Sequence, residues 1–235
     1  FIPPKVYADQ FDPQQMPGPH FRETDLEQQM KLRDIDFGGG AISPEERDAK
    51  AVQAKYYAMI AQIDDQLARI LDYLEETGQR DNTVIILTTD HGEMMGDHGL
   101  LQKGCRFYEG LVRVPLIFSW PGHFKTNLHS DALVELLDMT PTVLELTGLE
   151  VPDYVQGKTL LPILRGESDP AIHRDHVFSE YYNAWSHKHS YGTMLRTDSH
   201  KMIVYHGTDQ GELYDLSTDP DEFENLWNNP AQAGL

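Results

Sequence analysis

One glycine-rich stretch, residues 90–104, concentrates groups that could do chemistry. Asp90 and His91 are adjacent and offer a hard carboxylate oxygen and an imidazole nitrogen to one metal ion. Lys103, later in the same stretch, offers a mobile ammonium to an oxyanion beside that ion. These residue types together are typical of half of a metal-assisted site for sulfate or phosphate esters.

Other side chains in or just after this stretch need a separate interpretation. His98 has two readings that the residues leave open: it contacts substrate, or it orients the loop through Asp97. Cys105 is the only cysteine, and we expect an ordinary thiol beside the site rather than a nucleophile. Glu109 and Arg113 are four residues apart at the edge of a strand, which favours a structural ion pair.

The elements that must position these groups are strands. Residues 83–87 are apolar and largely β-branched, which predicts a buried parallel strand ending just before Asp90. Open α/β sheets bind their ligands at the carboxyl ends of such strands. Residues 114–120 predict a second buried strand, which ends at Pro121.

Helices are expected on both sides of these strands. Ser43 and Pro44 form a helix start, apolar residues follow at helical spacing, and Gly78 is a stop, so a long helix should run from about 44 to 77. Another helix should begin at Thr140 and stop at Gly148. Residues 1–42 are rich in Pro, Gly and Gln and predict an irregular surface segment.

After about residue 171 the pattern changes to short strands with polar breaks, expected at 176–181, 192–196, 201–205 and 212–215. A short helix should begin at Asp219. The fold class expected is therefore α/β: part of a mainly parallel central sheet flanked by helices, plus a small carboxy-terminal antiparallel sheet with a helix. The corresponding domains are residues 1–170 and 171–235.

Composition limits the partners of this 235-residue chain. Its net charge of −19, from 19 basic against 38 acidic residues, argues against a nucleic-acid partner, which needs a basic face. No apolar run approaches the roughly 20 residues that a membrane-spanning helix requires. A divalent cation and Lys103 could still reverse the potential locally for an anionic ester.

The stretch around Asp90 resembles the sulfatase family within the alkaline-phosphatase-like superfamily. In that family an Asp followed by His or Asn ends a central strand and binds the metal, and a Lys in a Lys-Gly-x-x-x-Tyr-Glu context binds the sulfate. The matching residues here are Asp90, His91, Lys103, Tyr108 and Glu109. The resemblance continues in the family's order through Arg113–Ile117, Asp138–Leu144, Gly157–Pro162, Glu212–Leu216, Asp219–Pro220 and Asn225–Leu226.

Parts of the family pattern have no counterpart in this chain. The family nucleophile, a Cys or Ser converted to formylglycine, lies in a Cys/Ser-x-Pro-x-Arg motif that the chain does not contain. The paired Asp ligands near the family's amino terminus are likewise missing. We therefore expect a carboxy-terminal portion of a longer enzyme, with the formylglycine upstream. This portion alone should be inactive, and its uncovered apolar surface should promote self-association.

The resemblance implies a sulfuric ester hydrolase. Asp90 and His91 would bind a divalent metal, most simply Ca²⁺, and Lys103 would bind sulfate or help the leaving group, with His98 as a further substrate contact. A sulfated small molecule or glycan would be the substrate, and a periplasmic or secreted location is expected. Two alternatives remain: a phosphonate monoester or phosphodiester hydrolase of the same superfamily, and a non-catalytic binding module.

One segment could shape the choice of substrate. His187, Lys188 and His189, with Trp185 nearby, could form a pocket edge, although a polar loop is the better interpretation.

Overall fold

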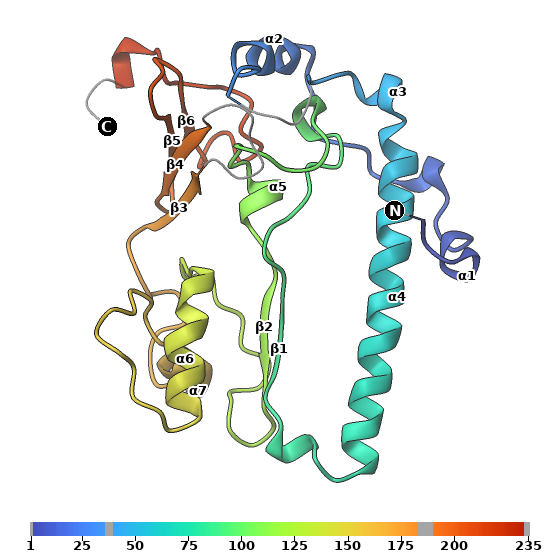
Figure 1. Cartoon of the computed structure of the whole chain (residues 1–235), viewed down its shortest axis with the longest axis vertical. Helices are drawn as coiled ribbons and strands as arrows, with labels where there is room; N and C mark the ends of the chain where they lie inside the picture. The colour runs from blue at the N-terminus through green and yellow to red at the C-terminus, as the bar shows by residue number, and fades with distance from the viewer. Residues whose placement is uncertain (1, 36–39, 183–189, 233–235) are drawn as a thin grey trace.

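The computed structural model describes residues 2–35, 40–182 and 190–232. The chain is a mixed α/β structure with two separate sheets (Figure 1). The helices are α1 (Lys5–Ala8), α2 (Glu23–Lys31), α3 (Pro44–Arg47), α4 (Ala49–Glu76), α5 (Glu109–Val112), α6 (Met139–Leu146) and α7 (Leu161–Arg165). The strands are β1 (Ile85–Thr88), β2 (Leu116–Ser119), β3 (Val177–Tyr182), β4 (Tyr191–Arg196), β5 (His200–Tyr205) and β6 (Gly211–Asp215). The expected α/β class is confirmed.

The long helix expected at 44–77 is present but broken. The Ser43 hydroxyl accepts a hydrogen bond from the backbone N–H of Glu46, and Pro44 occupies the first turn of α3, as a helix start requires. Asp48 then adopts a left-handed conformation (φ 50°), which separates α3 from the 28-residue α4. Gly78 follows the end of α4 with φ 66°, a conformation that glycine adopts without strain.

Strands β1 and β2 form a two-stranded sheet between α4 and the α6–α7 pair (Figure 1). Both strands lie where the sequence predicts them, and they belong to the same sheet. They run antiparallel, however, with Ile86 opposite Phe118, so the buried parallel strand expected at 83–87 has no parallel partner among the described residues. Neither strand contains a fully buried residue. An apolar run predicts that a strand is buried. It does not identify the partner strand, so it cannot predict whether the pairing is parallel or antiparallel.

Strands β3 to β6 form the expected small antiparallel sheet, in that order. Alternate residues of β5 are buried, namely Lys201, Ile203 and Tyr205, so one face of the sheet packs on the rest of the chain. The boundary near residue 170 stays a prediction, although all four strands lie after it.

Two local expectations are wrong. Residues 1–42 are not irregular throughout, because α2 forms a helix of nine residues with Asp25 and Gln29 buried. No α-helix begins at Asp219 either; the chain turns there, and Glu222 has a left-handed conformation (φ 59°) with its side chain buried. In both cases buried polar contacts with distant residues decide the local structure.

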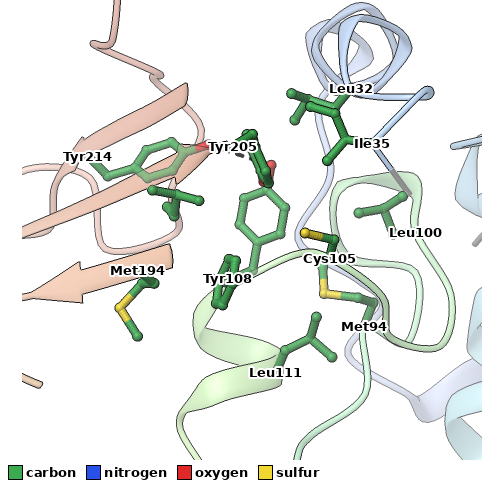
Figure 2. Packing of buried hydrophobic residues seen from close by; sticks show 12 residues of the cluster. Leu32, Ile35, Met94, Leu100, Cys105, Tyr108, Leu111, Met194, Tyr205 and Tyr214 are labelled. Carbon is green, nitrogen blue, oxygen red and sulfur yellow. Dashed lines mark hydrogen bonds between the residues drawn. The ribbon is translucent and has the colours of Figure 1, made fainter. Parts of the chain in front are cut away.

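The core lies between α2, the segment 94–111 and the inner face of β4–β6 (Figure 2). Its buried members are Leu32, Ile35, Met94, Leu100, Cys105, Phe107, Tyr108, Leu111, Met194, Ile203, Tyr205 and Tyr214. Because segment 94–111 contains Lys103, the core holds one side of the predicted site. Among the described residues, no helix is both long and apolar enough to cross a membrane.

Candidate functional site

Asp90 and His91 lie directly after the carboxyl end of β1, as the sequence predicts. The next residue, Gly92, donates its backbone N–H to the carbonyl of Leu111 at 2.8 Å. A Cβ at Gly92 would lie 1.9 Å from the Gly110 carbonyl oxygen, so only glycine fits at this position. The turn that presents Asp90 and His91 is therefore fixed against the start of α5.

The two side chains face each other across a short distance. The Nε2 atom of His91 lies 3.7 Å from Oδ2 of Asp90, and the exposed fractions of the two side chains are 41% and 85%. The pKa of the Asp90 carboxyl is below its ordinary value because the His91 imidazole lies beside it and the backbone N–H of His91 donates to it. The other ring nitrogen of His91, Nδ1, is 2.8 Å from the Gly92 carbonyl oxygen.

This donor pair fits one divalent cation. In the neutral imidazole, the ring nitrogen that contacts a carbonyl oxygen carries the hydrogen, which leaves Nε2 of His91 with a lone pair for a metal. Metal–ligand distances of about 2.0–2.6 Å allow atoms 3.7 Å apart to bind the same ion. Among the residues that the structure describes, no cluster of three or more His, Cys, Asp or Glu side chains could complete the shell. Asp90 and His91 could therefore supply two donors for a metal ion, and a full shell would need further ligands.

Lys103 lies on the same side of the molecule as this pair. Its neighbour Gln102 is connected to the loop after His91 at two points: the Gln102 N–H donates to the Glu93 carboxylate, and the Gln102 carbonyl accepts from Met94 N at 3.1 Å. The Lys103 side chain is exposed, whereas residues 104–108 after it are all buried. The loop that carries the Lys103 ammonium is therefore held on both sides, by the contacts of Gln102 before it and by the burial of residues 104–108 after it.

A cleft of about 1010 Å³ joins these residues. Asp90, His91 and Lys103 all line it, so the structure brings the three predicted site residues to one surface. Arg196 and Asp198, from the end of β4 and the turn after it, line the same cleft. The small antiparallel sheet therefore contributes to the wall of the site.

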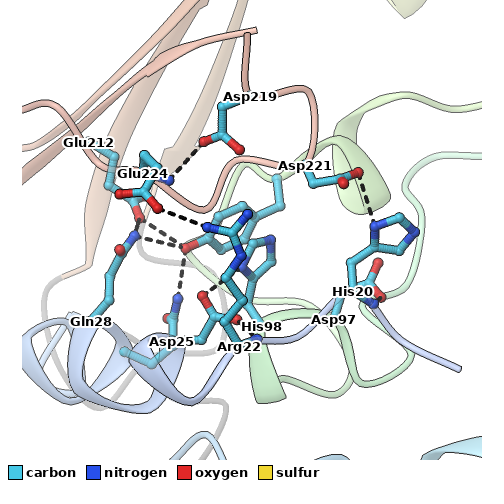
Figure 3. Close-up of polar contacts among 12 residues, drawn as sticks. His20, Arg22, Asp25, Gln28, Asp97, His98, Glu212, Asp219, Asp221 and Glu224 are labelled. Atoms are coloured by element: carbon cyan, nitrogen blue, oxygen red, sulfur yellow. Dashed lines mark hydrogen bonds and ion pairs between the residues drawn. The ribbon is translucent and has the colours of Figure 1, made fainter.

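His98 is placed differently from the other candidates. Its side chain is buried, its Nδ1 lies 3.2 Å from Oδ1 of Asp25, and its ring stacks on Tyr108 with 4.0 Å between the centroids (Figure 3). Burial favours the loop-orienting role over contact with substrate. The partner is Asp25 rather than Asp97, whose carboxylate instead accepts from the backbone N–H of His20 at 2.8 Å.

The sequence analysis missed an ionic contact at the back of the site. Glu109 does not pair with Arg113 as expected; its Oε1 lies 2.7 Å from Nζ of Lys201 and 3.2 Å from Nε of Arg196. Arg196 and Lys201 lie about 90 residues farther along the chain, beyond the reach of a local rule. The pattern of β5 offers one signal in the sequence: Lys201 is in the same inward-facing register as Ile203 and Tyr205.

The pocket edge considered at His187–His189 lies outside the described residues.

Comparison with protein-family models gives two matches that together span nearly all of the chain. The model described as Sulfatase matches residues 4–149. The model described as N-sulphoglucosamine sulphohydrolase, C-terminal, matches residues 96–235. Both include Lys103 and the start of α5.

Curated relatives and solved structures agree with these matches. An N-acetylglucosamine-6-O-sulfatase of Bacteroides thetaiotaomicron is 38% identical over 184 residues, covering 76% of this chain and 32% of the relative. An arylsulfatase of Clostridium perfringens is 31% identical over 235 residues, covering 97% of this chain and 46% of the relative. The structure of a phosphonate monoester hydrolase of Agrobacterium radiobacter aligns with a TM-score of 0.83 at 31% identity, covering 97% of this chain and 50% of that one. The chain thus spans between a third and a half of the length of these proteins.

Proposed function

This chain belongs to the sulfatase family, and from that premise we propose that it is the carboxy-terminal part of a sulfuric ester hydrolase. The observation that carries the proposal is the cleft that Asp90, His91 and Lys103 line together. A carboxylate, an imidazole with a free nitrogen and an ammonium on one surface suit a metal ion with an anionic ester beside it. The curated relatives that match this chain are longer, which supports a further segment in the full-length protein.

Each of the three residues has a distinct role in this proposal. Asp90 and His91 hold a divalent cation, most simply Ca²⁺, as two ligands of a shell that normally contains about six to eight oxygens. When bound, that cation neutralises charge on the ester oxygens and on the nucleophile. Lys103 binds the sulfate or stabilises the charge on the leaving oxygen. The nucleophile, a formylglycine, belongs to the segment upstream of Phe1.

The substrate class proposed is a sulfated small molecule or glycan. One relative is named for a sulfated amino sugar, N-acetylglucosamine 6-O-sulfate, which supports a sugar over other alcohols. The wall formed by Arg196 and Asp198 would contact a substrate larger than the sulfate group itself. A periplasmic or secreted location remains part of the proposal.

A phosphonate monoester hydrolase is the second candidate. The alignment with the enzyme of Agrobacterium radiobacter, at a TM-score of 0.83, favours it specifically. Sulfate and phosphonate monoesters both present anionic oxygens to a metal and a lysine, so the three residues alone do not separate the two reactions. Two of the curated relatives are named as sulfatases, which places the sulfate ester first.

The test is turnover by the full-length protein with Ca²⁺ present, on 4-nitrophenyl sulfate and on a 4-nitrophenyl phosphonate monoester. Asp90→Ala should lower sulfate ester turnover at least about a hundredfold and weaken Ca²⁺ binding in calorimetry, since it removes a metal ligand. Asp72→Ala, which removes an exposed carboxylate of α4, is the control and should change neither. Faster turnover of the phosphonate would select the second candidate. No turnover of either ester would favour a non-catalytic binding module.

A further inference from the structure

Lys201, on β5, is a charged residue with no exposed surface. A buried ammonium is costly unless several oxygens surround it, so lysine is rarely found in this state. The sulfate ester chemistry proposed above does not use Lys201. Its partners therefore indicate why it is buried.

Three oxygens lie within 2.9 Å of the Lys201 ammonium. The Nζ atom donates to the carbonyl oxygen of Phe107 at 2.9 Å and lies 2.7 Å from Oε1 of Glu109 and 2.7 Å from Oε1 of Glu222. The other carboxylate oxygen of Glu222 accepts from the backbone N–H of Glu109 at 2.7 Å. Lys201 and Glu222 thus hold residues 107–109 by two backbone groups and one side chain.

The sheet also supplies an electrostatic reason for this arrangement. Arg196 of β4 lies directly opposite Lys201, and two cations in that position repel each other. Glu109 lies within 3.2 Å of both, so its carboxylate neutralises the pair. Burial favours a neutral Glu109, but Lys201 and Arg196 outweigh it and lower the pKa of this carboxyl below its ordinary value. Arg196 and Lys201 together create a positive potential at this point of the sheet, and the Glu109 carboxylate neutralises it.

The same segment is held from the opposite side by α2. Arg106 donates to the side-chain oxygen of Gln29 at 3.0 Å and to the carbonyl oxygen of Leu32 at 3.2 Å. The hydroxyl of Tyr108 accepts from Gln29 at 2.7 Å. The chain is thus fixed from residue 105 to residue 109, and Lys103 is the exposed side chain just before this fixed run.

We propose that Lys201 is a positioning residue: together with Glu222 it fixes segment 105–109 against β5 and so sets the place of Lys103 in the cleft. The expected effect of Lys201 on turnover rests on the proposed function. Its expected effect on the position of segment 105–109 is independent of that function. Lys201 contacts the backbone carbonyl of Phe107 and the side chain of Glu109, and Glu222 binds the backbone N–H of Glu109, so the pair holds both ends of residues 107–109.

The first test uses Cys105 as a reporter in the 235-residue chain. It is the only cysteine, it is fully buried, and its Sγ would lie 3.0 Å from a Cβ placed on Gly192 of β4. A thiol reagent such as 5,5′-dithiobis(2-nitrobenzoic acid) therefore reacts only when the segment opens from the sheet. Slow labelling of the wild-type chain is expected, and labelling as fast as in denaturant would overturn the proposal.

Three variants give a graded result. Lys201→Met should speed Cys105 labelling at least about tenfold, because it removes the ammonium beside the buried Glu222 carboxylate and leaves Glu109 with Arg196 alone. Glu222→Gln keeps an oxygen for the Glu109 N–H and should speed labelling by about two- to fivefold. Arg174→Met is the matched control: Arg174 also pairs with two carboxylates, Glu135 and Asp138, but it does not contact the segment.

The control separates local opening from general loss of stability. Arg174→Met should leave Cys105 labelling within about twofold of wild type under conditions where denaturant titration shows each variant to be folded. Equal acceleration in Lys201→Met and Arg174→Met would overturn the proposal. The Glu222→Gln chain, which keeps size and most contacts, provides the same comparison if Lys201→Met does not fold.

The second test is a double-mutant cycle in the full-length protein on 4-nitrophenyl sulfate. Lys201→Met should lower kcat at least about tenfold when Lys103 is present and less than about twofold in the Lys103→Ala background, because it acts through Lys103. The same loss in both backgrounds would overturn the positioning role. If the wild-type protein hydrolyses no sulfate ester, the proposed function fails, and the Cys105 result alone decides whether Lys201 holds the segment.

Discussion

Two regions of this molecule are packed to very different degrees. In the region around segment 94–111, apolar side chains are buried together (Figure 2). Charged side chains such as Lys201 and Glu212 are buried there as well. In the region formed by β1, β2 and the second half of α4, no residue is fully buried, and several apolar side chains are half or more exposed, as with Ile63 at 61% and Ile117 at 54%. All buried residues of α4 lie in its first ten positions.

The difference shows what an apolar pattern does and does not determine. The pattern in α4 and in both central strands predicts elements that bury one or more faces. The described residues cover these faces only in part, whereas the curated relatives are two to three times longer. We interpret the packed region as self-sufficient and the open region as dependent on further chain. Self-association through the exposed face stays a prediction.

The largest effect expected from this comparison is on catalysis. The 235-residue chain alone should hydrolyse no 4-nitrophenyl sulfate above background with Ca²⁺ present, because two ligands and a lysine supply neither a nucleophile nor a full metal shell. The full-length protein should hydrolyse it under the same conditions. Sustained turnover by the chain alone would show that the catalytic groups all lie within it.

A smaller effect, on the free energy of unfolding, tests the difference in packing with a matched pair of Ile→Ala substitutions. Ile203→Ala, in the buried face of β5, should reduce the free energy of unfolding by about 2–5 kcal/mol through lost burial and a cavity. Ile63→Ala, on the exposed face of α4, should change it by no more than about 0.5 kcal/mol. Denaturant titration of the 235-residue chain measures both. Equal losses would mean that the open face of α4 is covered, for example in a dimer.

Much of the fold could be predicted because its signals are local. Ser43 marks a helix start by hydroxyl capping, Gly78 and Gly148 mark helix ends by positive φ, and all three lie where the sequence predicts them. The four strands after residue 171 were found within one or two residues at each end, because their polar breaks are short and sharp. Asp90 was placed at the end of β1 for the same reason: an apolar run stops there.

The remaining features depend on contacts between residues far apart in the chain. Helix α2 has no apolar stripe to predict it; its buried side chains are Asp25, which binds the nearby Arg22 N–H and the distant His98, and Gln29, which binds the distant Tyr108. At Glu222 the chain adopts a left-handed turn instead of the predicted helix, and the Glu222 carboxylate contacts Lys201. In the sequence, Lys201 is only a polar residue within a predicted strand. Its role becomes apparent from the structure, in which Glu109 lies beside it. Buried polar groups are recognised only when the tertiary structure supplies their partners.

The measurement that tests the central claim most directly is sulfate ester turnover by the full-length protein after Lys103→Ala. If Lys103 stabilises charge on the sulfate beside a metal held by Asp90 and His91, kcat should fall by about 10²–10³-fold. Lys55→Ala, which removes an exposed lysine of α4, should leave kcat within about twofold and controls for the change in net charge. Wild-type turnover in the Lys103→Ala protein would contradict the account and remove this lysine from the site.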